Sequence, residues 1–351
     1  MPIQGFTRLR KHQFGRQAAI GTRIAAKRAY PFSGVPDHNL NWTDPEIDVG
    51  SIDPVAAPYR LAPDLTAALT DPALRYNSLP LLLSAVFGDA VTPTGAGTAK
   101  TWSFAPSSTT VDAIDTYTYE FGDDVTTDWF QYGDSLLETL EITGPEDLGP
   151  LTTSMTWRMG SIFSSGSTDA PDAPTVPTAL DVAPNEAIVY LKDGGIYIAS
   201  GAYDLDAGQI SDALHTFTLR INQPYDQKRF ANATQVFDVS GYGRGPREIE
   251  LEATYAKTTD TVGIGSESDS WMRDQSVDRY IQMRFESTVE AEAATPYSWV
   301  FSMPARYFTR TEGDVGGNTV VVLTAHAWYD PEDFNGVFRS TVINSLASTS
   351  L

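Results

Sequence analysis

Cysteine is absent from this chain of 351 residues, which excludes disulfide bonds, thiolate metal ligands and a cysteine nucleophile. Histidine is scarce, and the residues His12, His38, His215 and His326 lack the mutual or carboxylate spacing that is typical of metal sites. No run of about 18 apolar residues occurs, and the N-terminal residues lack the apolar core of a secretory signal. We therefore expect a soluble protein, intracellular where it is made, with no metal site and no membrane segment.

Signatures of catalysis are also missing. The glycine-rich stretch from Gly241 to Pro246 precedes a strand-like alternation and not a helix, so it offers no helix N-terminus to a phosphate group. We interpret it as a turn. Acidic pairs do occur, as chance predicts in a chain with 45 Asp and Glu residues. The sequence thus indicates no catalytic residue, no cofactor and no enzymatic activity.

Basic residues are few and unevenly placed. Lys and Arg number 24, which gives a formal net charge of -21 and argues against wrapping nucleic acid. Residues 1–30, however, contain seven basic side chains and no acidic one. We predict that this basic arm contacts neighbouring copies of the acidic body, the alternative being a solvated or membrane-surface arm. The predicted contact residues are Arg8, Arg10, Lys11, Arg16 and Arg23.

The composition favours a mainly β fold. Aromatic and β-branched residues are frequent, and 27 Gly and 22 Pro interrupt them. A stretch crowded with small residues and prolines predicts a linker at residues 164–184, between β domains at 31–163 and 185–351. The alternative is a long surface loop within one domain.

Local patterns fill in the two halves. Residues 79–88 predict a helix that Ser78 caps and Gly88 ends. Strand-like alternation recurs in both halves, and residues 266–275 predict a second brief helix. We expect a β-sandwich or half-barrel duplicated in tandem, although the halves show no obvious residue identity.

One strand concentrates negative charge. Glu248, Glu250 and Glu252 alternate with apolar residues, which places the three carboxylates on one side of the strand. A solvated outer face is the simpler interpretation. If the strand lined a pore, the same row of acids would repel phosphate and let DNA pass without adhering.

Several segments together resemble one protein family. They are FGRQAAIGT at 14–22, NWTDP at 41–45, DVGS at 48–51, YRLAPDLTA at 59–67, the predicted helix, YEFGDDVTTDWF at 119–130, GDSLLETLEITGP at 133–145 and the closing residues 338–346. These segments are similar to the major tail proteins of long, non-contractile-tailed bacteriophages, particularly those of actinobacteria. The resemblance covers most of the chain, and its motifs belong to the scaffold and not to a catalytic site.

The resemblance implies a fold, a place and a set of partners. Such proteins form a β-sandwich flanked by a helix and assemble into stacked rings, whose inner sheets join into a continuous β-barrel around a channel. The chain would then be a virion protein of the tail, assembled in the host cytoplasm, with other copies of itself as partners. Tape measure, tail terminator and tip proteins are further implied partners, and DNA would pass through without adhering.

The number of chains in a ring depends on the duplication. If each half is one tube unit, three chains form a ring with pseudo-sixfold symmetry, whereas six chains are expected if one half lines the channel. The duplication favours three slightly.

Other functions are also compatible with this sequence. A secreted or surface carbohydrate-binding β-sandwich would show exposed aromatic residues clustered on a groove, whereas Trp157, Trp299 and Trp328 lie in alternating patterns that indicate core. An acidic hydrolase, a capsid decoration protein and a tail terminator are further alternatives.

Overall fold

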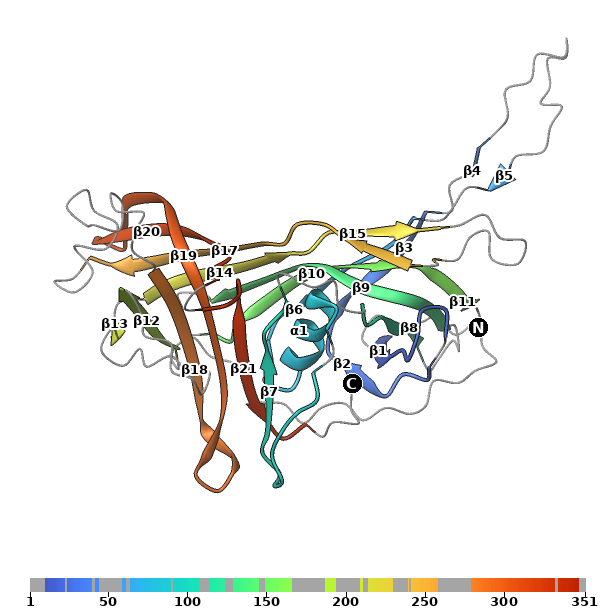
Figure 1. Cartoon of the computed structure of the whole chain (residues 1–351), viewed down its shortest axis with the longest axis horizontal. Coiled ribbons are helices and arrows are strands. Elements are labelled where there is room, and N and C mark those ends of the chain that lie inside the picture. Colours follow the sequence, from blue (N-terminus) through green and yellow to red (C-terminus); the bar gives the residue numbers. More distant parts are fainter. Residues whose placement is uncertain are drawn as a thin grey trace, which may run out of the picture.

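The computed structural model describes residues 10–22, 24–39, 42–43, 59–60, 64–89, 91–107, 114–123, 129–144, 149–165, 187–193, 209–210, 214–229, 239, 241–257, 279–331 and 334–346. Within this part of the chain, seventeen strands are connected by hydrogen bonds into one antiparallel network (Figure 1). The helix α1 (Leu79–Phe87) is the only α-helix of the described residues. The predicted mainly β fold with a short flanking helix is therefore confirmed.

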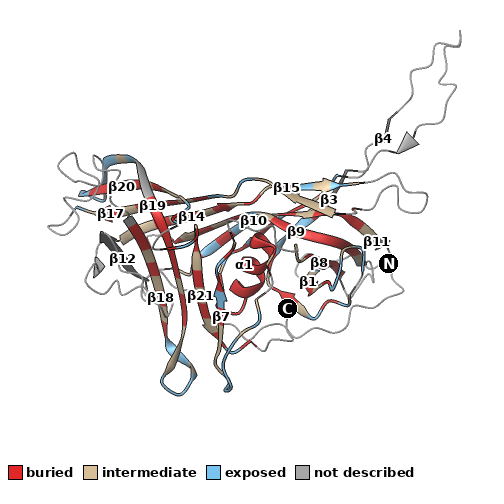
Figure 2. Ribbon diagram, viewed as in Figure 1, coloured by how far each residue is buried: buried red, intermediate tan, exposed pale blue. Residues whose placement is uncertain are grey.

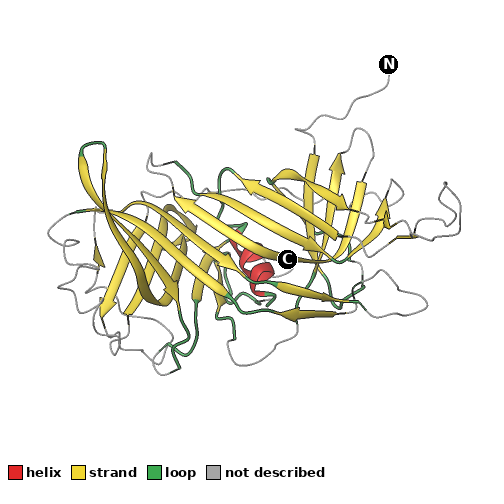
Figure 3. Cartoon of the chain, turned by 90° about the horizontal axis from the view of Figure 1, so that it is seen from above, coloured by secondary structure: helices red, strands yellow, loops and turns green. Residues whose placement is uncertain are grey.

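Eight strands lie side by side in one sheet, here called the long sheet, which is seen from above in Figure 3. Every neighbouring pair in it is antiparallel. In order across the sheet, the strands are β3 (Ser33–Asn39), β6 (Asp64–Asp71), β10 (Thr152–Met159), β9 (Trp129–Gly144), β14 (Leu214–Asn222), β17 (Glu248–Ala256), β20 (Asn318–Ala327) and β19 (Thr295–Val315).

Two smaller sheets form the second layer. The first has the order β2 (Arg28–Tyr30), β1 (Arg10–Arg16), β8 (Tyr117–Asp123), β9 and β11 (Ser161–Ser165). The second has the order β13 (Gln209–Ile210), β12 (Ala187–Asp193), β18 (Arg279–Glu292), β19, β21 (Arg339–Asn344) and β7 (Lys100–Phe104). The strands β9 and β19 are long enough to belong to both layers, so each ties the long sheet to one of the smaller sheets.

The pattern of strand pairing occurs twice along the chain. Eight strands of the first half make seven pairings, and eight strands of the second half make the same seven in the same arrangement. In chain order, the first set is β1, β2, β3, β6, β8, β9, β10 and β11, and the corresponding second set is β12, β13, β14, β17, β18, β19, β20 and β21. Two hairpins, β4 (Trp42–Thr43) with β5 (Tyr59–Arg60) and β15 (Tyr225–Lys228) with β16 (Gly241–Arg244), follow the equivalent strands β3 and β14. The pairing of these sixteen strands thus forms a topological repeat, to which α1 and β7 (Lys100–Phe104) have no counterpart among the described residues of the second half.

The repeat divides between β11 and β12, and residues 166–186 between them lie outside the described residues. Two pairings cross this division, β9 with β14 and β7 with β21. A single cluster of buried apolar residues also includes members of both halves. The predicted domain and linker boundaries stay a prediction. The predicted second helix at residues 266–275 lies outside the described residues.

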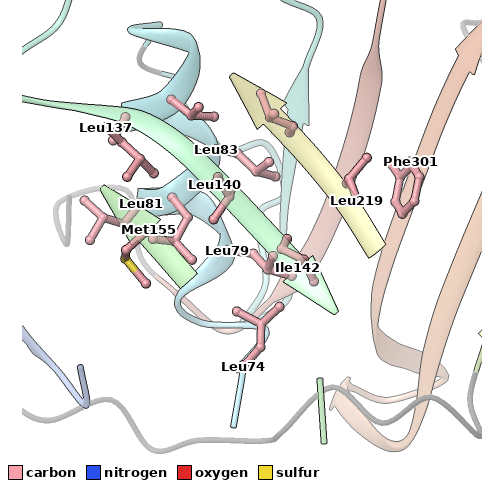
Figure 4. Packing of buried hydrophobic residues seen from close by; sticks show 14 of the residues in the cluster. Leu74, Leu79, Leu81, Leu83, Leu137, Leu140, Ile142, Met155, Leu219 and Phe301 are labelled. Atoms are coloured by element: carbon pink, nitrogen blue, oxygen red, sulfur yellow. The ribbon is translucent and has the colours of Figure 1, made fainter. Parts of the chain in front are cut away.

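Helix α1 packs between the layers (Figure 1). All nine of its residues are buried, and the helix carries apolar side chains on nearly every side, as is typical of a helix inside a core. Figure 4 shows Leu79, Leu81 and Leu83 in one apolar cluster with Leu140 and Ile142 of the long sheet. Gly88 ends the helix in the left-handed conformation, as predicted, whereas Ser78 makes no side-chain capping hydrogen bond.

The second half completes the end of this helix. Tyr225 donates a hydrogen bond to the carbonyl of Val86 at 2.8 Å, and Arg244 donates to the carbonyl of Gly88 at 2.9 Å. Both donors come from the β15–β16 hairpin. Because Gly241–Arg244 form the strand β16, the prediction of a turn was wrong for these four residues, whereas Gly245 and Pro246 lie in the connection to β17.

The strand β9 changes layers at a sharply bent residue. Asp134 is fully buried and has a φ of 54°, in the left-handed region. Its carboxylate accepts hydrogen bonds from the amide of Gly21 at 2.7 Å and the hydroxyl of Ser161 at 3.2 Å. Its own amide donates to Gln17 at 2.8 Å. These bonds hold the bend from two separate segments of the chain, residues 17–21 and Ser161.

Candidate functional site

The outer face of the long sheet is the candidate functional surface. Along β14 and β17, half-exposed polar positions alternate with buried apolar ones (Figure 2). The buried apolar face of the long sheet is here called the dry face, and the opposite, solvent-facing side is called the wet face. The dry face contributes Phe217, Leu219 and Ile221 to the core, each 2 % exposed or less. The alternation continues in phase from β6 to β17, whereas residues 309–314 of β19 are exposed or half-buried on both faces.

The three predicted acids lie on this wet face. Glu248 is exposed, while Glu250 and Glu252 are half-buried, and the alternation over β17 is confirmed. Glu250 accepts a hydrogen bond from Arg220 on β14 at 2.8 Å and lies 3.1 Å from Nε2 of His326 on β20.

Arg220 links the two halves of the chain. It donates to Glu141 on β9 at 2.9 Å and to Glu250 on β17, and it lies 3.7 Å from Glu252. The hydrogen bonds to Glu141 and Glu250 raise the pKa of the Arg220 guanidinium. Since its side chain is 43 % exposed, each ion pair contributes at most about 1 kcal/mol. Its clearest effect is to neutralise part of the row of acids where the halves meet.

The first half of the wet face carries a smaller charged group. Arg158 on β10 donates to Glu138 at 2.7 Å and lies 3.6 Å from Asp64 on β6. Asp37 on β3 is exposed at the end of the sheet. Among the described side chains, acids therefore outnumber arginines along the whole face.

Three of the five predicted arm contacts lie in β1, inside the first small sheet. Arg16 forms an ion pair with Asp115 at 2.9 Å, and Lys11 is half-buried. Arg10 is exposed, and its guanidinium carbon lies 5.7 Å from the ring centre of Phe121. The other two, Arg8 and Arg23, lie outside the described residues. A role of these five in contacts between rings stays a prediction.

Among the side chains that the structure describes, the exposed aromatic residues form no cluster. Trp102, Trp157 and Trp299 are fully buried, and the large apolar side chains that are exposed there are the scattered Val35, Val289 and Tyr329. Trp328 is half-buried, so its assignment to the core was wrong.

Sequence reasoning missed Arg220 as the partner of the acids and missed the contacts of His12. The side chain of Arg220 alternates in phase with its neighbours on β14, but which strand lies beside β14 is a property of the tertiary fold. His12 is 2 % exposed and its Nδ1 lies 2.8 Å from the hydroxyl of Tyr119. Burial, together with the nearby Arg10, lowers the pKa of His12 to about 4.

The described residues contain no group of three or more His, Asp or Glu side chains placed to hold a metal ion. No helix among them has the length and apolar character needed to span a membrane. No protein-family model matches the chain, and no curated protein is found with a similar sequence.

Proposed function

We propose that this chain is the structural subunit of a bacteriophage tail tube, which closes into rings around a channel for DNA. The observation that carries the proposal is the long sheet. It consists of two repeated four-stranded parts, its outer face is polar and rich in acids, and its end strands β3 and β19 have no second neighbouring strand among the described residues. The resemblance of the scaffold segments to phage major tail proteins supports the same function.

In a closed ring of copies, the edge strands β3 and β19 of each long sheet would pair with edge strands of the neighbouring copies. Exposed edges invite uncontrolled aggregation, and a closed barrel removes them. Because each chain contributes two equivalent units, three chains supply six units and give pseudo-sixfold symmetry to the ring.

The size of the channel favours three chains. Strands about 4.8 Å apart and tilted by about 40° give a barrel of 24 strands a backbone diameter of roughly 48 Å. Six chains would double this to roughly 96 Å by the same geometry. Since barrels of about 16 strands already leave an aqueous channel, three chains suffice.

The charge of the wet face supports the passage of DNA. In a ring, Glu248, Glu250 and Glu252 would face the channel and repel phosphate groups. Arg220 donates hydrogen bonds to Glu141 and Glu250, so its positive charge is partly neutralised and would attract the phosphate groups of DNA only weakly.

Negative-stain electron microscopy of the purified chain tests the proposal. We expect rings or hollow tubes of uniform diameter. A protein that stays a monomer at every concentration and ionic strength, and that binds a ligand in a cleft, would contradict it.

A further inference from the structure

The two ends of the long sheet are complementary strand edges. Among the described residues, β3 pairs with β6 alone, and the C-terminal part of β19 pairs with β20 alone. Both edges run along the same sheet in which the two halves are already joined. The chain therefore contains an example of how one half pairs with the next.

That example is the pairing of β9 with β14, here called the internal seam. The two strands run antiparallel over six residue pairs and join the first half to the second. Its wet-face pairs are Asn222 with Thr139, Arg220 with Glu141 and Thr218 with Thr143.

The repeat relates β9 to β19 residue by residue. Both strands carry a bulge where they pair with the next strand, between Leu137 and Thr139 in β9 and between Tyr307 and Thr309 in β19. Aligning the bulges makes Thr139 equivalent to Thr309 and Leu137 equivalent to Tyr307. Counting onward along each strand makes Thr143 equivalent to Gly313.

The same alignment carries across the sheet to the other edge. Each strand pairing in the first half has its counterpart in the second, so the register partners of two equivalent residues are themselves equivalent. The equivalent residues met in turn are Thr156 and Thr324, Ala68 and Glu252, and Val35 and Thr218. The strand β3 is thus the counterpart of β14, the partner strand in the internal seam.

From this equivalence, we propose that β3 of one copy pairs antiparallel with β19 of the next copy in the register of the internal seam. The proposal rests on the proposed function, and it specifies the contact that closes the ring. The predicted wet-face pairs are Asn39 with Thr309, Asp37 with Thr311, and Val35 with Gly313.

The side chains at these edges are compatible with the register. Val35 is 54 % exposed in the single chain, and Gly313 is exposed and has no side chain that could obstruct a partner strand. On the opposite face of β19, Glu312 accepts hydrogen bonds from Arg310 at 2.8 Å and from Lys257 at 2.9 Å. Covering this edge therefore does not bury an uncompensated charge.

The contact between copies should be weaker than the internal seam. The internal seam has the ion pair of Arg220 with Glu141 and the buried Leu140 and Ile142, each 1 % exposed or less. The equivalent residues of Leu140 and Ile142 in β19 are Arg310 and Glu312. In β3, Pro36 has no N–H to donate, as is typical of prolines on edge strands. A weaker contact allows each copy to fold alone and to pair afterward.

Disulfide trapping tests the register, and the absence of native cysteine makes it unambiguous. Paired residues on antiparallel strands have Cα atoms about 4.5–5.5 Å apart, within the range of a disulfide. A copy carrying Asp37→Cys is mixed with a copy carrying Thr311→Cys under assembly conditions and then oxidised. The matched control replaces Thr311→Cys with Thr309→Cys, which lies on the same exposed face two residues away.

We expect the first mixture to give a strong band at twice the chain mass on a non-reducing gel, and the control to stay almost entirely at the mass of one chain. With Asp37→Cys and Thr311→Cys in the same chain, the covalent ladder should end at three chains. If rings or tubes form but the control pair cross-links as well or better, the register is overturned while the proposed function stands. If the cysteine-free chain forms neither rings nor tubes, both fail.

Discussion

His12 is the clearest case of a residue whose environment the sequence concealed. It belongs to the basic N-terminal segment, yet it lies in β1, stacked on Tyr119 at a ring-centre distance of 6.0 Å. Alternation in residues 10–16 is irregular, with Lys11, His12 and Gln13 adjacent, so the pattern gives no sign of a strand. The high charge of the segment dominated the prediction, whereas pairing with β2 and β8 determines its structure.

The lowered pKa of His12 makes stability depend on pH. Folded His12 has a pKa of about 4, below the ordinary value of 6.5, so the unfolded chain binds the extra proton first as pH falls. Above pH 6.5 His12 is mainly neutral in both the folded and the unfolded chain, so it does not lower stability. Between pH 6.5 and pH 4 the unfolded chain is protonated first, and the free energy of unfolding falls. Between pH 7 and pH 5 this costs about 2 kcal/mol.

Replacing His12→Gln should remove that part of the pH dependence. We expect the variant to be less stable than the parent at pH 7, because packing is lost, but to lose about 2 kcal/mol less between pH 7 and pH 5. Urea unfolding at the two pH values measures the difference. The same pH dependence in both proteins would show that His12 does not titrate on unfolding.

At the scale of elements, the bend in β9 lets one strand serve two sheets. The alternation within residues 139–143 was readable from the sequence, as was the helix, because each follows a local period. The change of layer at Asp134 was not, since it depends on hydrogen bonds from Gly21 and Ser161, which are remote in sequence. For the same reason, the order of strands could not be derived from the sequence.

Asp134→Ala should destabilise the fold by about 2–4 kcal/mol, because two buried hydrogen bonds are lost and alanine is strained at positive φ. Asp134→Asn is the matched control, since asparagine tolerates this conformation and keeps one acceptor oxygen. We expect it to cost about 1 kcal/mol. Thermal and urea unfolding compare the two, and equal losses would mean that the bend does not depend on these bonds.

At the scale of the whole molecule, the tandem repeat was predictable in outline. Similar strand patterns in both halves indicated it, although the equivalence of individual residues required the pairings and bulges of β9 and β19. The alternation over residues 248–252 indicated a row of acids on one face of a strand. It did not indicate Arg220, which lies where the two halves meet.

Electron cryo-microscopy of the assembled particle in cross-section shows whether the ring is closed. We predict three chains in each ring, with their long sheets joined into one sheet of 24 strands, eight from each chain, around the channel. A ring of six chains, or long sheets that do not meet at β3 and β19, would contradict it.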